Sequence, residues 1–413
     1  MAIPKHWQST RLSEVLSECD DRCGTLSVPV LSVTKTRGLM LASERFGRVM
    51  HGKNLAAYRL ARRGTLVADP MLLWDGSIGI QDVVDAGAVS PDYRVYCVSD
   101  QLDLEYLRNL IRSPAMVRRY QDGARGTNVR RNRITRDDFL AIPFERPPLP
   151  EQKKIAAVLS SVDETIAKTE SVIAQLQIVK KAMMEQLLTK GMPGRHTRFK
   201  QTEIGEIPEE WEVVPLYSVA TVQTGIAKGK AVGEEALSVP YLRVANVQDG
   251  FIDLTEIKEI EITPEQLPRF SLQAGDVLFC EGGDADKVGR GTVWLGQITP
   301  CLHQNHVFAV RPQLSKLIPE FLSMVRSSNS GKQYFLDSAK QTTNLASINS
   351  TQLKSFPTPL PSTEEQHEIV AAIASIVAAL DKEQGVLSSC QSLKSALSSS
   401  LLSGEIRVIP GVA

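Results

Sequence analysis

Arginine and asparagine side chains gather in one short segment of the first third of the chain. The run is interrupted by Gly123 and Gly126, continues with arginines at 133 and 136, and includes Arg118, Arg119, Arg125, Asn128, Arg130 and Arg131. Arginine can donate two hydrogen bonds to guanine, and asparagine or glutamine can pair similarly with adenine. The segment therefore predicts contacts with DNA bases. The alternative is a solvated loop whose arginines form ion pairs with Asp137 and Asp138.

The second half of the chain carries a polar segment at the matching place, composed of Lys340, Gln341, Thr343 and Asn344. A basic, glycine-containing loop with Lys228 and Lys230 suits contacts with phosphate groups. Arg290 lies in a glycine-rich stretch, residues 280–291, that lacks the order of a phosphate-binding loop, so a DNA-facing or structural turn is favoured over nucleotide binding. Gln304 and Asn305, between two histidines, are also expected to face base edges.

The residues of an active site are not found in this sequence. It lacks the Asn/Asp-Pro-Pro-aromatic loop with which a DNA adenine methyltransferase grips a flipped base, and it lacks a glycine-rich loop for a methyl donor. Its six histidines stand in none of the common catalytic frames. We therefore expect no catalytic residue, no cofactor and no metal. The six cysteines are scattered, and free, reduced thiols are expected for all of them.

Length and charge indicate a protein of two or three domains. The 413 residues carry no net charge, but residues 1–148 hold 22 basic and 17 acidic residues, a balance of +5, and 19 of the basic residues are arginine. Residues 192–360 and 361–413 each carry −3. No apolar run is long enough to span a bilayer and the first residues lack a signal-peptide core, so a cytoplasmic protein without membrane contact is expected.

Two long helices are predicted to position the polar segments. Residues 149–191 and 361–404 each show apolar residues at seven-residue spacing, which is typical of a coiled coil. The central positions of the two stripes are Ile155, Val162, Thr169, Leu176, Met183, Ile369, Ile376, Glu383, Cys390 and Leu397. A helix of about forty residues spans roughly 60 Å.

The sequence also repeats itself at a constant offset of 214 residues. Glu151-Gln152 corresponds to Glu365-Gln366, and Leu187-Leu188 to Leu401-Leu402. The stretches 1–148 and 207–360 correspond more weakly, each with short β-branched and aromatic runs between turn residues. We therefore predict an α+β protein in which two similar domains, each with a twisted β-sheet and short helices, are separated by an antiparallel coiled coil with a pseudo-two-fold. Residues 192–206 form a connector and 405–413 a tail.

This pattern resembles the specificity subunit of type I restriction-modification enzymes. The resemblance rests on the doubled proline-rich start that ends in Glu151-Gln152 and Glu365-Gln366, on the connector from Gly191 to Trp211, and on Gly275-Asp276-Val277-Leu278-Phe279. The first domain departs from it, because Gly64-Thr65 has no aspartate at the position of Asp276. The resemblance implies a non-catalytic subunit whose two target-recognition domains each bind half of a split, asymmetric site in double-stranded DNA. It also implies docking of two modification (methyltransferase) subunits and of restriction subunits, which are ATP-dependent translocases and nucleases.

Two alternatives to this function remain open. One is a methyltransferase or nuclease in a single polypeptide with cryptic motifs, and the other is a coiled-coil adaptor that binds no DNA. Antiparallel packing with a pseudo-two-fold would bring Thr169 near Glu383, because each is the middle position of its stripe.

Overall fold

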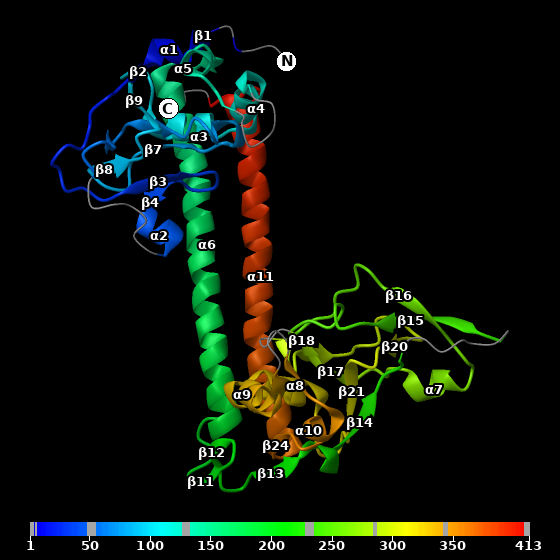
Figure 1. The fold of residues 1–413 in the computed structure, drawn as a ribbon. Helices are drawn as coiled ribbons and strands as arrows, with labels where there is room; N and C mark the ends of the chain where they lie inside the picture. Colours follow the sequence, from blue (N-terminus) through cyan, green and yellow to red (C-terminus); the bar gives the residue numbers. More distant parts are fainter. Residues whose placement is uncertain are drawn as a thin grey trace. The chain divides into compact units, whose positions relative to one another are not determined.

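The computed structural model describes residues 4, 6–47, 55–125, 133–227, 235–283, 287–341 and 346–408. The chain divides into two compact units (Figure 1). Residues 1–171 and 384–413 form the first unit, and residues 172–383 form the second. Each unit contains one globular domain and about half of each of two long helices.

The first unit is built around a four-stranded sheet with the order β2-β9-β6-β7. Strand β1 pairs with β10, β3 with β4 and β5 with β8, all antiparallel. The elements are β1 (Gln8–Arg11), α1 (Leu12–Val15), β2 (Leu16–Glu18), β3 (Leu31–Thr34), β4 (Gly38–Leu41), α2 (Ala42–Phe46), β5 (Arg59–Arg62), β6 (Leu66–Ala68), η1 (Leu73–Asp75), β7 (Ile78–Ile80), β8 (Ala86–Val89), β9 (Arg94–Val98), α3 (Leu104–Ile111), α4 (Pro114–Gly123), α5 (Arg136–Leu140) and β10 (Pro143–Arg146).

The second unit contains a four-stranded sheet with the order β14-β21-β17-β19. Three-stranded sheets β16-β15-β20 and β18-β23-β22 accompany it. The elements are β11 (Phe199–Thr202), β12 (Gly205–Pro208), β13 (Glu212–Pro215), η3 (Leu216–Ser218), β14 (Ala220–Thr224), β15 (Leu237–Leu242), β16 (Lys258–Ile262), α7 (Gln266–Phe270), β17 (Val277–Cys280), β18 (Gly282–Gly283), β19 (Gly291–Val293), β20 (Leu302–His303), β21 (Val307–Pro312), α8 (Pro319–Ser327), α9 (Asn329–Ser338), β22 (Lys340–Gln341), β23 (Ala346–Ser347), α10 (Ser350–Lys354) and β24 (Pro357–Leu360).

The two domains share one strand order, so β2, β9, β6 and β7 correspond to β14, β21, β17 and β19. Gly64 and Gly275 precede β6 and β17 with φ of +86° and +94°, a left-handed turn that favours glycine. In both domains two helices follow the sheet, α3 and α4 in the first and α8 and α9 in the second. The duplicated α+β fold expected from the sequence is confirmed.

The long helices are α6 (Leu149–Lys190) and α11 (Thr363–Leu402), and Gly191 and Gly404 follow them with φ of +72° and +75°. In the first unit the start of α6 shares a hydrophobic core with the end of α11, through Ile155, Leu159, Leu401 and Leu402. In the second unit the end of α6 shares a core with the start of α11, through Leu187, Leu188, Ile369 and Ile373. The two helices are therefore antiparallel within each unit.

The predicted central positions of the helix pair are buried from solvent to different degrees. Ile155, Thr169 and Ile369 are buried, and the other seven are half-buried. Thr169 and Glu383 belong to different units, so their proximity stays a prediction. None of the helices in the described part of the chain combines the length and the apolarity that crossing a membrane requires.

The cysteines differ from expectation in one pair. Cys19 and Cys97 form a disulfide, so the prediction that all six are free thiols is wrong for these two. The chain beyond β2 continues beside β9, where the Cys19 amide donates to the Val95 carbonyl at 2.9 Å, and this brings the two sulfurs together. Cys23, Cys280, Cys301 and Cys390 are free, and burial raises the pKa of Cys301 to about 12.

Candidate nucleic-acid interface

Each domain is fastened to its long helix by the glutamate and glutamine of the repeated sequence. In the first unit the buried Gln152 side chain accepts a hydrogen bond from the Asp103 amide at 2.9 Å. Its NH2 group donates to the carbonyls of Gln101 at 3.0 Å and Pro147 at 2.9 Å. Glu151, also buried, accepts from the Trp7 indole at 3.2 Å and contacts His6 at 2.8 Å. The start of α6 is thereby bonded both to the start of the domain and to the turn before α3.

The second unit repeats these bonds at the start of α11. Gln366 accepts from the Ile318 amide at 2.9 Å and donates to the carbonyls of Lys316 at 2.8 Å and Pro361 at 3.0 Å. Glu365 accepts from the Trp211 indole at 3.0 Å. The connector after α6 adds the Met192 amide at 3.0 Å and His196 at 2.8 Å. Because buried polar groups are costly when unpaired, this set of partners explains why glutamate and glutamine stand here.

The arginine-rich segment of the first domain is held at its base as a hairpin. Arg125 and Arg133 exchange two backbone hydrogen bonds of 2.9 and 3.1 Å. The Arg125 guanidinium lies 3.2 Å from Asp138, and 80% of the Arg125 side chain is exposed. Thr135 caps α5 by accepting from the Asp138 amide at 3.1 Å, and its hydroxyl donates to the Asp138 carboxylate at 2.7 Å. The base of this hairpin is therefore fixed against α5.

A hairpin also follows the helix pair of the second domain. Strands β22 and β23 pair Lys340 with Ser347 and Gln341 with Ala346, and β23 also pairs with β18. A Cβ at Gly282 would lie 2.5 Å from the Ala346 carbonyl, so this close approach requires glycine. Asn349 then caps α10, accepting from the Gln352 amide at 2.9 Å. Both domains thus present helix pair, hairpin, capped short helix and strand in the same order.

Several residues predicted to contact DNA make internal bonds. Arg119 donates to the Pro143 carbonyl, whereas Arg118 lies exposed on α4. Arg290 is half-buried and donates to the Val244 carbonyl at 3.0 Å. These bonds occupy part of the donor groups of Arg119 and Arg290, and their contact with DNA stays a prediction.

The histidine-flanked pair lies beside the second hairpin. Asn305 contacts His306 at 3.5 Å, and His306 lies 2.5 Å from the Glu281 carboxylate. The Glu281 carbonyl accepts from the Ile348 amide, just after β23, at 2.8 Å. The half-buried Gln304 is bonded through its backbone to Leu242 at 2.8 Å. His303 is fully buried, and desolvation lowers its pKa, which favours the neutral ring.

Seven of the residues predicted to contact DNA lie outside the described residues. These are Asn128, Arg130 and Arg131, Thr343 and Asn344, and Lys228 and Lys230 of the basic loop. For Gln341 only the backbone is described, while the adjacent Lys340 is exposed. Their assignment as DNA contacts stays a prediction.

Sequence reasoning missed an ionic cluster in the first domain. Glu18, at the end of β2, contacts Arg59, Arg94 and Arg136, which come from three other elements. No spacing in the sequence signals this cluster, because residues 18, 59, 94 and 136 meet only when the strands pair. Within the described ranges, no group of three or more His, Cys, Asp or Glu side chains is arranged to hold a metal ion.

The geometry defines a duplicated α+β protein in which each domain presents a polar hairpin after a helix pair. Residues 76–177 and 208–388 match the family described as type I restriction modification DNA specificity domain. These ranges cover more than half of the chain, and the chain therefore belongs to this family.

Named relatives agree with this membership. The chain is 29% identical over 358 residues to the type I restriction enzyme MjaVIII specificity subunit of Methanocaldococcus jannaschii, covering 82% of this chain and 79% of that protein. It is 29% identical over 275 residues to the EcoKI specificity subunit of Escherichia coli strain K12, covering 62% and 54%. A match to a putative MjaX specificity subunit of M. jannaschii, at 31% identity, spans 47% of this chain and about half of that relative, 46%.

Solved structures share the fold. A chain from a study of complex assembly and conformational transition of the type I R-M system superposes with a TM-score of 0.60 at 17% identity, covering 98% of this chain and all of that one. The type I restriction-modification S subunit from M. genitalium gives 0.52 at 13% identity, covering 97% and 98%.

Proposed function

We propose that this chain is the DNA-specificity subunit of a type I restriction-modification complex and that it binds a bipartite, asymmetric target in double-stranded DNA. The observation that carries the proposal is the duplication: two domains with one strand order, each bonded to the start of its own long helix and each carrying a polar hairpin after its helix pair. Two similar but non-identical domains suit two half-sites of different sequence.

The hairpins are the proposed base-contacting elements. In the first domain these contacts are Arg125, Asn128, Arg130 and Arg131, and in the second they are Gln341, Thr343 and Asn344. The base of each hairpin is bonded to its domain, which reduces the ordering entropy that binding would otherwise cost. Substituting one base contact should cost about 1–3 kcal/mol and relax specificity at a single position.

The proposed subunit is not itself an enzyme. It docks two modification subunits, which carry the methyl-donor site, and through them restriction subunits, and it acts in the cytoplasm where DNA is available. Family membership supports this assignment, and so does the sequence, which lacks donor-binding and catalytic loops.

Co-expression with the modification subunits, followed by sequencing of methylated bases in the host genome, tests the proposal. The expected result is one split sequence whose halves lie about one helical turn (roughly 34 Å) apart. An uninterrupted methylated sequence would contradict the bipartite target. A complex that assembles but shows no salt-dependent retention on DNA would identify a coiled-coil adaptor. Methyl transfer by the purified chain alone would show that it is an enzyme.

The helices are the proposed ruler between the half-sites. Inserting one heptad into each of α6 and α11 should change the gap between the half-sites and leave their bases unchanged. Altered half-site bases with an unchanged gap would refute this role.

A further inference from the structure

Three arginines of the first domain converge on one carboxylate. Glu18 Oε1 lies 3.4 Å from Arg59 Nη1 and 3.1 Å from Arg94 Nη1, and Glu18 Oε2 lies 2.7 Å from Arg136 Nε. The Glu18 and Arg59 side chains are only 17% and 11% exposed. Arg94 and Arg136 are more open, at 35% and 49%. Arg59, Arg94 and Arg136 are called the arginine cluster below.

The charges around the cluster do not balance. Asp20 contacts Arg59 at 2.8 Å, but it also contacts Arg22 at 3.1 Å. Four guanidinium groups therefore share two carboxylates, which leaves a net charge of +2. Each guanidinium has five N–H donors, and Glu18 can occupy only a few of them. Arg94 and Arg136 therefore keep positive charge and donor groups close to solvent.

The fold itself does not require charge at this place. Strand register aligns Leu66 with Val277, Tyr96 with Val310, and Arg94 with Phe308. The same register aligns Glu18 with Val222 of the second domain. Val222 and Phe308 belong to the apolar core there. Because apolar side chains fill the corresponding position in the second domain, the arginine cluster is specific to the first domain.

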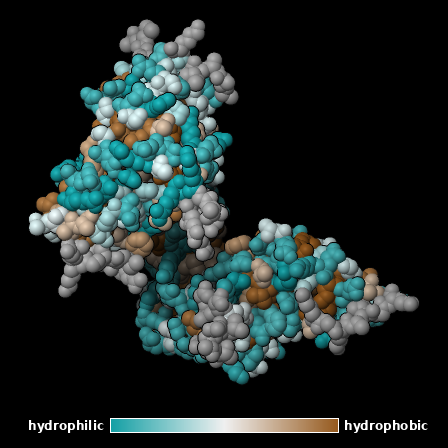
Figure 2. Space-filling model, turned by 45° about the horizontal axis from the view of Figure 1, so that its top comes forward, coloured by the Kyte–Doolittle hydropathy of each residue, from teal (hydrophilic) through white to brown (hydrophobic). Residues whose placement is uncertain are grey.

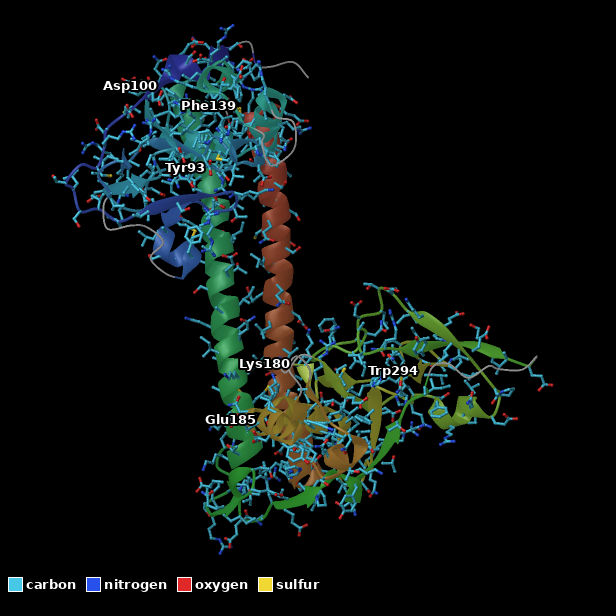
Figure 3. The ribbon with its side chains drawn as sticks, viewed as in Figure 1. Tyr93, Asp100, Phe139, Lys180, Glu185 and Trp294 are labelled. Carbon is cyan, nitrogen blue, oxygen red and sulfur yellow. A yellow bond between two sulfur atoms is a disulfide. The ribbon has the colours of Figure 1, made fainter. Side chains whose placement is uncertain are left out.

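The cluster lies next to the base of the first hairpin. Arg136 begins α5, three residues after Arg133, which closes the hairpin. Phe139 of α5, labelled in Figure 3, packs on Tyr96 with ring centroids 5.3 Å apart, and Tyr96 lies opposite Glu18 in the sheet. Hydrophilic residues cover much of the face of this domain that Figure 2 shows. α5 and the sheet thus fix the arginines relative to the hairpin.

We propose that Arg94 and Arg136, positioned by Glu18, bind a backbone phosphate of the DNA duplex whose bases the first hairpin contacts. This inference rests on the proposed function. A phosphate oxygen accepts charge-assisted hydrogen bonds from guanidinium forks, and such contacts set the position of a protein on the duplex without specifying bases. Glu18 holds the like-charged groups together before DNA arrives.

The test measures DNA binding by the complex of this chain with its modification subunits. One duplex carries the methylated sequence and the other has both half-sites scrambled. Dissociation constants are measured by fluorescence anisotropy from about 50 to 200 mM salt. The variants are Arg94→Ala, Arg94→Lys and Arg136→Ala. Arg63→Ala is the matched control, because Arg63 is also exposed and pairs with one carboxylate, Asp85, at 3.0 Å.

We expect Arg94→Ala and Arg136→Ala each to weaken binding to both duplexes by up to about eightfold at 0.1 M salt. The slope of log K against log salt should fall by up to about 0.9, the value for complete loss of one phosphate contact, because the other arginine stays in place in each variant. Arg94→Lys should retain the slope, Arg63→Ala should match wild type, and the methylated sequence should not change in any variant.

Unchanged salt slopes in both alanine variants would overturn the phosphate site, and so would a loss confined to the duplex with the methylated sequence. If Arg94→Ala does not fold, Arg136→Ala decides, because its more exposed side chain makes a single ion pair. A wild-type complex that binds both duplexes equally would overturn the proposed function and this inference with it. A selective wild type with unchanged slopes in the variants would overturn the phosphate site alone.

Discussion

The two domains share one strand order but place their charges at different positions of it. In the second domain the buried Asp276 accepts two bonds of 2.7 Å from Arg311. The register of β9 and β21 aligns these positions with Thr65 and Cys97 in the first domain, where Cys97 is bonded to Cys19. At this corresponding position of the two sheets, Arg311 forms an ion pair with Asp276 in the second domain, whereas Cys97 forms a disulfide with Cys19 in the first.

At further corresponding positions, one domain has a charged side chain where the other has an apolar one. The glutamine bonds align the turn before α3 with the turn before α8, and on this alignment the buried Ile111 corresponds to the buried Arg326. Conversely, Glu18 and Arg94 correspond to Val222 and Phe308. Backbone pairing and apolar positions therefore set this fold, whereas a charge is accepted wherever its partner accompanies it.

Breaking the Asp276–Arg311 pair should have the largest effect. Arg311→Ala leaves a buried carboxylate without its guanidinium, so we expect a loss of about 2–4 kcal/mol, less than for a pair that water cannot reach. Urea denaturation followed by tryptophan fluorescence measures it. The double variant Asp276→Thr/Arg311→Cys copies the residues of the first domain and should lose less than Arg311→Ala. An equal or greater loss would contradict the comparison.

Substitution of Gln152 or Gln366 should lower the free energy of unfolding to a similar extent, because the two side chains make equivalent hydrogen bonds in the two domains. Gln152→Ala and Gln366→Ala each remove three hydrogen bonds from buried groups, so each should lower the free energy of unfolding by about 1–3 kcal/mol. Gln177→Ala and Gln391→Ala, exposed on the same helices, are matched controls expected to be near neutral. A large loss in only one domain would show that the bonds are not equivalent.

Substitution of the helix-capping residues that follow the hairpins should have a smaller effect on stability. Thr135→Ala and Asn349→Ala remove the caps of α5 and α10, at a cost of about 1 kcal/mol each. Glycine is tolerated at such positions, so Thr135→Gly and Asn349→Gly should cost only a few tenths of that value. Thermal denaturation of the four variants checks the order, and an alanine variant as stable as its glycine counterpart would contradict the capping role.

The smallest effect should be a dependence of the stability of the second domain on pH. Burial opposes ionisation of Asp249, but Arg326 at 2.7 Å and Lys332 outweigh it, so the pKa of Asp249 lies below its ordinary value. Its contribution is therefore present above about pH 4 and is lost as the pH falls further. Asp249→Asn should be less stable than wild type above pH 4, with the gap narrowing in more acidic urea titrations. A gap that stays constant down to pH 2.5 would exclude this linkage.

The long helices and the duplication could be predicted from the sequence, because both depend on local signals. Seven-residue spacing and terminal glycines gave α6 and α11, and the repeated Glu-Gln pairs gave the correspondence between halves. The role of those pairs could not be predicted. The Trp211 partner of Glu365 lies 154 residues away, and both glutamines bond to backbone atoms, which leave no trace in residue type.

The site was predictable only in part for the same reason. Arginine density located the first hairpin, but Arg119 and Arg125 each have a partner inside the domain that composition did not assign. The arginine cluster depends on the pairing of β2 with β9, so its residues are unrelated in sequence spacing. Local sequence therefore locates the polar segments, whereas tertiary pairing decides which of their charges remain available.

The glutamine bonds also mark two backbone amides for measurement in solution. The amides of Asp103 and Ile318 each stand at the start of a helix, where an N–H group has no partner within the helix. Here the side chains of Gln152 and Gln366 protect them, so hydrogen exchange at each amide requires its domain to separate locally from its long helix. The exchange rates at residues 103 and 318 therefore report, one domain at a time, how often each recognition domain opens from the helix that carries it.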